Sequence, residues 1–181
     1  MNTNKDVADY YRRGLSAVPE ERLCYSPHLT VLILDMNSLK EIPDSVGRSL
    51  TQLTQISCAY NKLSTLPKSI GNLTRLTSLR AHYNMIKQLP DEVGECRELK
   101  DVNLAGNPLV TLPHTFRNLR NVTRLVLCNA QFTSFPMPIL ELENLSMLDL
   151  SGNNSMAEFP HGISKLTALT ILFMRNTAIT S

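Results

Sequence analysis

Residues 53–75 read LTQISCAYNKLSTLPKSIGNLTR, and residues 76–98 read LTSLRAHYNMIKQLPDEVGECRE. Both follow one pattern, LxxLxLxxNxLxxLPxxIxxLxx, in which x stands for any residue. Residues 99–121, LKDVNLAGNPLVTLPHTFRNLRN, follow it once more. Because several independent positions keep phase from copy to copy, the sequence predicts a chain built by stacking one small structural unit.

The pattern extends outward from these copies over most of the 181 residues. Its copies begin at apolar residues spaced by 24, 23, 23, 23, 23 and 24 positions, namely Leu29, Leu53, Leu76, Leu99, Val122, Leu145 and Leu169. This spacing predicts an N-terminal cap with a degenerate half repeat over residues 1–28. Residues 29–181 then form a repeat domain of six full repeats and one partial repeat. The last repeat stops before its LP turn, so we expect the C-terminal end to be truncated or covered by a partner.

The first half of each repeat alternates as a short strand does. We expect Leu148 and Leu150 to point inward, for example, and Asp149 between them to point outward. An asparagine then ends the strand, where an inward amide can bond to backbone groups of the turn and of the next coil. These residues are Asn37, Asn61, Asn84, Asn107 and Asn153. Ala130 replaces the asparagine in one repeat, and the neighbouring Asn129 is a candidate substitute.

The second half of each repeat predicts a turn and a return segment. Proline presets its own φ and disfavours helix at the preceding residue, so each apolar-proline dipeptide turns the chain. The following PxxIxxL spacing favours a short helix or 3-10 turn. Where a repeat has 24 residues, we expect the extra one near Ser49 and near Asn154. At the N-terminus, residues 5–13 predict a short polar helix that shields the first coil.

On this pattern the chain resembles the intracellular leucine-rich-repeat proteins with 23-residue LPxxI repeats, which include the Ras-suppressor, Ras-scaffold and plant intracellular Ras-group types. The resemblance covers residues 29 to 181. It implies an α/β solenoid with a curved parallel sheet on the concave face and short helices or 3-10 turns on the convex face. It also implies a protein-binding scaffold or adaptor in signalling, with a small GTPase or a phosphatase complex as one class of partner.

Composition limits the other classes of function. The net charge of +2 is too small to favour nucleic acid as a partner. No apolar stretch reaches the roughly 18 residues of a membrane-spanning helix, and the N-terminus lacks the apolar core of a secretory signal. Cys24, Cys58, Cys96 and Cys128 show no CxxC spacing, so neither a zinc site nor a disulfide framework is indicated. We therefore expect a cytoplasmic protein without a cofactor, a metal, a membrane contact or a small-molecule substrate.

Catalysis is not indicated either. The sequence contains no HExxH, GxGxxG or P-loop motif. The one His and Cys that share a column of the expected sheet are His82 and Cys128, which lie two strands apart. That separation is roughly 9–10 Å, too far for a hydrogen-bonded nucleophile and base. Cys58 and Cys96 fall at core positions of the repeat, where we expect them to act as small buried hydrophobes.

Outward strand residues and the strand ends offer the best candidate contact surface, because stacking aligns them into exposed columns. Tyr and Arg are common in binding hot spots, and apolar residues that cluster on a surface mark interfaces. The predicted protein-binding residues are Tyr60, Arg80, His82, Tyr83, Asp101, Asn103, Arg124, Met147, Asp149 and Phe173.

Each part of this surface has a simpler alternative. The tyrosines could only fill space in the turns, and Asp101 and Arg124 could simply pair with each other. An apolar group of Met147, Ile171 and Phe173, with Val126 close by, could be covered by residues beyond Ser181. Two other functions stay open: a substrate-targeting domain of a larger enzyme, such as a ubiquitin ligase or a cyclase, and a structural subunit of a large assembly.

Overall fold

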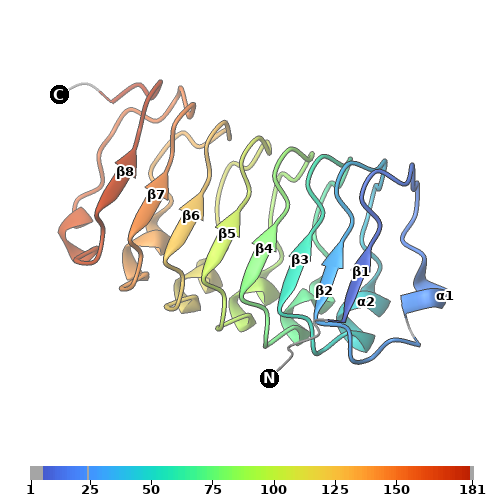
Figure 1. Cartoon of the computed structure of the whole chain (residues 1–181). Coiled ribbons are helices and arrows are strands. Elements are labelled where there is room, and N and C mark those ends of the chain that lie inside the picture. Colours follow the sequence, from blue (N-terminus) through green and yellow to red (C-terminus); the bar gives the residue numbers. More distant parts are fainter. Residues whose placement is uncertain (1–5, 24, 180–181) are drawn as a thin grey trace.

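The computed structural model describes residues 6–23 and 25–179, which wind into a solenoid with one strand in each coil (Figure 1). All eight described strands are three residues long because the alternating segment of each repeat is short. They are β1 (Val7–Asp9), β2 (Val31–Ile33), β3 (Gln55–Ser57), β4 (Ser78–Arg80), β5 (Asp101–Asn103), β6 (Arg124–Val126), β7 (Met147–Asp149) and β8 (Ile171–Phe173).

These strands form a single parallel sheet in which each strand pairs with its neighbour in the sequence. The register is constant: Ser57 of β3 lies opposite Arg80 of β4, which lies opposite Asn103 of β5. The repeat phase read from the sequence is therefore the phase of the fold, and the predicted solenoid with its parallel sheet is confirmed.

Short helices cover the opposite, convex face of the solenoid (Figure 1). Two are α-helices, α1 (Glu20–Leu23) and α2 (Asp44–Ser49). The other five are 3-10 helices: η1 (Lys68–Asn72), η2 (Asp91–Glu95), η3 (His114–Asn118), η4 (Met137–Glu141) and η5 (Ile163–Lys165). The proline of the LP dipeptide directly precedes α2 and η1 to η4, with φ between −63° and −72° and an extended ψ, so it turns the chain as expected.

The helix expected over residues 5–13 is wrong. Residues 7–9 form strand β1, which pairs with β2, and Lys5 lies outside the described residues. Ala8 and Tyr10 take the inward positions that leucines hold in later coils, and both pack against the core. Without β1, the backbone edge of β2 would be unpaired, which favours an added strand. The sequence did not reveal this strand because the segment is polar and lacks the leucines of the repeat pattern.

A continuous aliphatic core runs between the sheet and the convex helices. In the central coils the repeat leucines are fully or almost fully buried, as are Cys58 and Cys96. The prediction that these two cysteines act as small core hydrophobes is confirmed. Phe116 and Phe132 are the largest of the fully buried side chains in this core.

The asparagine ladder links successive coils. Asn61 accepts a hydrogen bond at Oδ1 from the Leu39 amide (3.0 Å) and donates from Nδ2 to the carbonyls of Leu34 (3.0 Å) and Cys58 (3.1 Å). The equivalent bonds recur at Asn84, Asn107 and Asn153. Each ladder asparagine thus bonds within its own coil and to the preceding coil, not to the next one as expected.

At Ala130 the ladder asparagine is absent, and backbone hydrogen bonds replace those that its side chain would form. The Leu109 amide, which a ladder asparagine would bind, donates instead to the carbonyl of Asn107 (2.8 Å). The two carbonyls that such an asparagine would bind, those of Leu104 and Leu127, accept bonds from Asn107 and Asn153. Within the described ranges no hydrogen bond from the Asn129 side chain takes over, so the proposed substitution by Asn129 is wrong.

The extra residues of the 24-residue repeats lie where they were expected. In the first, the return segment forms the six-residue α-helix α2, which ends at Ser49, in place of a five-residue 3-10 turn. In the second, two residues, Asn154 and Ser155, separate the ladder residue Asn153 from the buried Met156. Only one residue separates the equivalent pair, Asn84 and Ile86, in a 23-residue repeat.

Candidate protein-binding surface

The strand register brings the predicted contact residues into ordered columns on the concave face. Arg80 and Asn103 lie in the central column, followed by Val126, Asp149 and Phe173 on the next three strands. Asp101, Arg124 and Met147 form the neighbouring column. The arrangement in space is the one predicted, and the side-chain contacts decide which of these residues form a group.

Tyr60, His82 and Tyr83 form one compact aromatic cluster at the edge of the concave face. The rings of Tyr60 and Tyr83 stack with centroids 4.7 Å apart and planes 20° apart. The imidazole of His82 meets both rings edge-on, at 5.4 Å from Tyr60 and 5.8 Å from Tyr83. Both tyrosines nevertheless remain 45% and 46% exposed. Nearly half of each tyrosine side chain therefore faces solvent.

The backbone at these tyrosines is in the left-handed region, a feature that the sequence analysis missed. The residue just before each ladder position has a positive φ, including Tyr60 (54°) and Tyr83 (53°). Glycine, which adopts this conformation freely, holds the same position at 106 and 152, and asparagine holds it at 129 and 176. A tyrosine here costs roughly 1–2 kcal/mol. The glycines and asparagines at this repeat position were the only indication in the sequence that its backbone is left-handed.

Glycine at position 106 is also required by space. A Cβ atom added to Gly106 would lie 2.6 Å from Cδ1 of Tyr83, because the tyrosine ring lies against this glycine. Tyr83 is thus enclosed on two sides, by the Tyr60 ring and by the backbone of the next coil. This packing fixes the orientation of the aromatic cluster before any partner arrives.

The surroundings of His82 favour the neutral form of its imidazole. Burial lowers the pKa of its imidazole below the ordinary value of 6.5, Asp35 nearby raises it, and Arg80 lowers it. Its Nδ1 atom is buried and has no hydrogen-bond partner among the described residues. The histidine therefore contributes a neutral ring to the cluster and leaves the charge of this surface to the arginines and carboxylates.

Two arginines share one carboxylate beside the cluster. Asp101 pairs with Arg80 through Oδ2 (3.1 Å) and with Arg124 through Oδ1 (3.0 Å). Both guanidinium groups stay about half exposed, so the two ion pairs add little stability, about 1 kcal/mol or less each. The expected pairing of Asp101 with Arg124 is confirmed, and Arg80 joins it.

Asn103 and Asp149 have a structural role. The Oδ1 atom of Asn103 accepts a hydrogen bond from the Ala105 amide (3.1 Å), and that of Asp149 accepts one from Ser151 (2.9 Å). Each side chain thus caps the carboxyl end of its own strand. Asp35 does similar work across coils, accepting bonds from the Ser57 hydroxyl and the Ala59 amide.

Met147, Asp149 and Phe173 lie apart from the aromatic cluster, on β7 and β8. Ile171 and Phe173 on β8 are exposed and Met147 is half-buried. Val126, expected to be exposed with them, is only 6% exposed. Its short side chain stands in the sheet between the longer side chains of Asn103 and Asp149, which explains this error.

The described thiols are poor nucleophiles. Burial raises the pKa of Cys58, with a further contribution from Asp35, and burial and Glu95 raise that of Cys96 to about 12. Burial and the nearby Asp149 raise the pKa of the half-buried Cys128. Cys24 lies outside the described residues. In residues 6–23 and 25–179, no group of three or more His, Cys, Asp or Glu side chains is placed to hold a metal ion.

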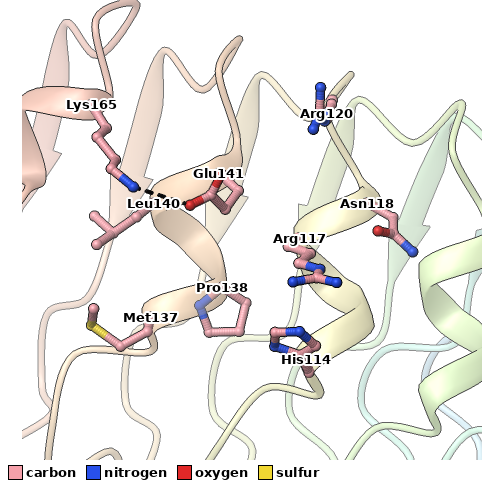
Figure 2. A pocket seen from close by; sticks show the side chains of 9 residues that line it. All are labelled: His114, Arg117, Asn118, Arg120, Met137, Pro138, Leu140, Glu141 and Lys165. Atoms are coloured by element: carbon pink, nitrogen blue, oxygen red, sulfur yellow. Dashed lines mark hydrogen bonds and ion pairs between the residues drawn. The ribbon is translucent and has the colours of Figure 1, made fainter.

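A depression on the convex face offers a second candidate site. It lies between η3 and η4, and Figure 2 shows the side chains that line it, including His114, Arg117 and Pro138. Glu141 pairs with Lys165 of η5 at 3.2 Å, on the side of η4 away from η3 (Figure 2). Arg120 pairs with Glu143 at 3.5 Å. Most of its charges are therefore already balanced, and we interpret it as a solvated gap between helices.

Comparisons with known proteins agree with this fold. Two family models described as leucine-rich repeat match residues 27–86 and residues 144–166. A leucine-rich repeat and calponin homology domain-containing protein from Drosophila melanogaster is 39% identical over 51 residues, which are 28% of this chain and 6% of that protein. None of the helices in the described part of the chain is long and apolar enough to cross a membrane.

Two solved structures share the architecture. An internalin from Listeria monocytogenes superimposes with a TM-score of 0.80 at 23% identity, over 91% of this chain and 46% of the internalin. The leucine-rich-repeat ectodomain of the plant membrane receptor kinase GASSHO1/SCHENGEN3 from Arabidopsis thaliana, in complex with CASPARIAN STRIP INTEGRITY FACTOR 2, gives 0.78 at 29% identity, over 89% of this chain and 20% of that one. The chain spans less than half of either protein.

The fold and the matches together define the class: the chain is a leucine-rich-repeat solenoid. This architecture commonly serves as a protein-interaction module. The resemblance to the Ras-suppressor type within that class stays a prediction.

Proposed function

We propose that this chain is a non-catalytic protein-binding module whose contact site centres on Tyr60, His82 and Tyr83. One observation carries the proposal. Two exposed tyrosines are held at backbone positions where glycine or asparagine would cost less. The fold imposes this backbone conformation in every coil, so what it does not account for is a tyrosine in place of glycine or asparagine, and residues held at such a cost concentrate at functional sites.

The surroundings of the cluster support the same role. Its rings are fixed by stacking and by contact with Gly106, so little conformational entropy is lost when a partner binds. Arg80 and Arg124 stand beside it, oriented by Asp101. Preorganised Tyr and Arg side chains are the typical anchors of protein interfaces. The Arabidopsis receptor ectodomain, whose architecture is similar, was solved with a bound protein factor.

The finer assignments are part of the proposal. We propose a cytoplasmic scaffold or adaptor in signalling, with a small GTPase or a phosphatase complex as the partner class. The resemblance to the Ras-suppressor type supports these assignments. These assignments are independent of the proposed location of the contact site and are tested separately.

The test uses asparagine, the residue that the fold itself places at positions 129 and 176. The double variant Tyr60→Asn/Tyr83→Asn removes the rings and relieves the backbone strain. Loss of the stacked pair costs about 0.5–1.5 kcal/mol, and the relief returns a similar amount. We therefore expect a nearly unchanged melting temperature, while capture of partners on the immobilised protein falls.

The matched control is Met137→Asn, because Met137 is an exposed apolar residue on the convex face. It should retain the full set of captured proteins. The conservative variant Tyr83→Phe keeps the ring and should also retain them. Undiminished capture by the double asparagine variant would exclude this cluster as the contact site.

A further inference from the structure

The loops beside the tyrosines carry several cations and no anion of their own, with Asp35 and Glu41 directly flanking the second loop. These loops follow the strands of the first four coils, over residues 12–16, 36–40, 60–64 and 83–87, and they contain no Asp or Glu. We call their five cations the basic rim: Arg12, Arg13, Lys40, Lys62 and Lys87. The equivalent loops of later coils, residues 106–110, 129–133 and 152–156, have no charged residue.

The cations of the basic rim point into solvent. In each loop a buried apolar residue, such as Leu39, Leu63 or Ile86, anchors the chain, and the residues on either side of it face outward. Lys40, Lys62 and Lys87 are exposed in this way on three successive coils. None of the five cations forms an ion pair with another described residue, whereas Arg80, Arg120 and Arg124 all do.

An exposed apolar row runs alongside the basic rim. Met36, Tyr60 and Tyr83 hold the same position in successive coils, and Tyr11 lies one residue before the equivalent position of the first coil, which is Arg12; all four apolar side chains are exposed. The Tyr11 hydroxyl contacts Sδ of Met36 at 3.3 Å, and the Tyr60 and Tyr83 rings stack. Cationic and apolar side chains thus follow the same four coils. Both end at the coil of Gly106, from which the equivalent loops carry no charged residue.

From this juxtaposition we infer that the edge of the first four coils docks an acidic segment of a protein partner, one that also carries apolar side chains. The inference rests on the proposed function and specifies the chemistry of the partner. Carboxylates on the segment face the basic rim, and its apolar side chains pack along the row from Tyr11 to Tyr83. Complementary charge orients such a segment and accelerates its association.

A single-stranded nucleic acid fits this edge less well. Bases bind to such surfaces by stacking on open aromatic faces. Tyr83 has one face against the Tyr60 ring and lies against Gly106 on the other side, so this tyrosine offers its ring edge and hydroxyl group to a partner. Edges and hydroxyl groups suit side chains and peptide carbonyls better than they suit bases.

The experiment selects binders from a displayed library of random short peptides on the immobilised 181-residue chain. We expect the selected peptides to be enriched in Asp and Glu together with apolar residues. The triple variant Lys40→Glu/Lys62→Glu/Lys87→Glu should weaken their binding about tenfold or more, since three exposed charge pairs become repulsive. Binding to the unmodified protein should also weaken as salt is raised.

The matched control is Lys68→Glu/Lys100→Glu/Arg117→Glu, which changes the net charge equally at exposed cations outside the basic rim. It should leave peptide binding within about twofold of the original. Selected peptides without acidic residues, or equal losses in the two triple variants, would overturn the inference. So would tighter binding of a labelled oligouridylate than of the peptides, if the rim variant alone abolished it.

The same measurements separate the inference from the proposed function. If acidic peptides lose binding to the rim variant but not to Tyr60→Asn/Tyr83→Asn, the basic rim stands and the tyrosine site fails. If the tyrosine variant loses binding and the rim variant keeps it, the tyrosine site stands and the acidic partner is wrong.

Discussion

The backbone cost at the residue before each ladder position depends on the side chain that stands there. Gly106 and Gly152 adopt a positive φ without steric cost, whereas Tyr60 and Tyr83 do not. The ladder residue that follows provides the compensation, because its amide bonds to backbone groups of two coils at once. A strained residue is thus held next to one of the most strongly bonded side chains in the fold.

The ladder predicts a large effect for a small truncation. Asn107→Ala removes the acceptor for the Ile86 amide and the donor to the carbonyls of Ala81 and Leu104, all of which are buried. We expect the free energy of unfolding to fall by about 1–3 kcal/mol, measured by denaturant titration. The natural Ala130 shows that the backbone can adapt locally, so a loss well under this range would mean that Asn107 is compensated in the same way.

His82 predicts a pH dependence of stability. Its pKa is lowered in the folded state, mainly by burial, so the unfolded chain binds a proton more readily than the folded one. Its contribution to stability is therefore present above pH 6.5 and is lost as the pH falls toward the lowered pKa. We expect the melting temperature of His82→Gln to fall less between pH 7 and pH 5 than that of the original protein. Parallel curves would show that the histidine pKa is the same in both states.

At the scale of elements, the spacing of the convex helices depends on one position in each return segment. Gly47, Gly71 and Gly94 occupy this position in α2, η1 and η2, and each approaches the backbone of the next helix. In η3 the same position is Arg117, and the convex depression opens between η3 and η4. Glycine thus permits close stacking, and a long side chain in its place coincides with the gap.

This spacing predicts that replacement by alanine at the same position has a large effect in η2 and a small one in η3. A Cβ atom at Gly94 would lie 2.5 Å from the carbonyl oxygen of Thr115, so Gly94→Ala must push η2 and η3 apart. We expect a loss of about 1–3 kcal/mol in the free energy of unfolding. Arg117→Ala at the equivalent position should change it by no more than about 0.5 kcal/mol. Equal effects would contradict the role of glycine in helix spacing.

At the scale of the whole molecule, the repeat phase alone predicts the sheet, the convex helices and the columns of outward residues, because only one strand register is compatible with stacked repeats. The side-chain contacts within the columns are harder to predict from the sequence. Nothing in the pattern shows that Asn103 caps its strand, and the left-handed conformation of Tyr60 is signalled only indirectly, by glycine or asparagine at the same position of other repeats. Strand β1 was missed because Ala8 and Tyr10 replace the leucines by which repeats are recognised.

The linear architecture finally predicts how the chain opens. Each coil contacts only its neighbours, so a coil at an end has half the support of one in the middle. The inward residues Leu148 and Leu150 of the β7 coil are fully buried, whereas Leu172 and Met174 of the β8 coil are only partly so. We expect native-state hydrogen exchange to be slowest in β4 and β5 and progressively faster toward β1 and β8. Uniform protection from β1 to β8 would mean that the coils open as one cooperative unit, and the aromatic cluster would then gain no extra rigidity from its central place in the stack.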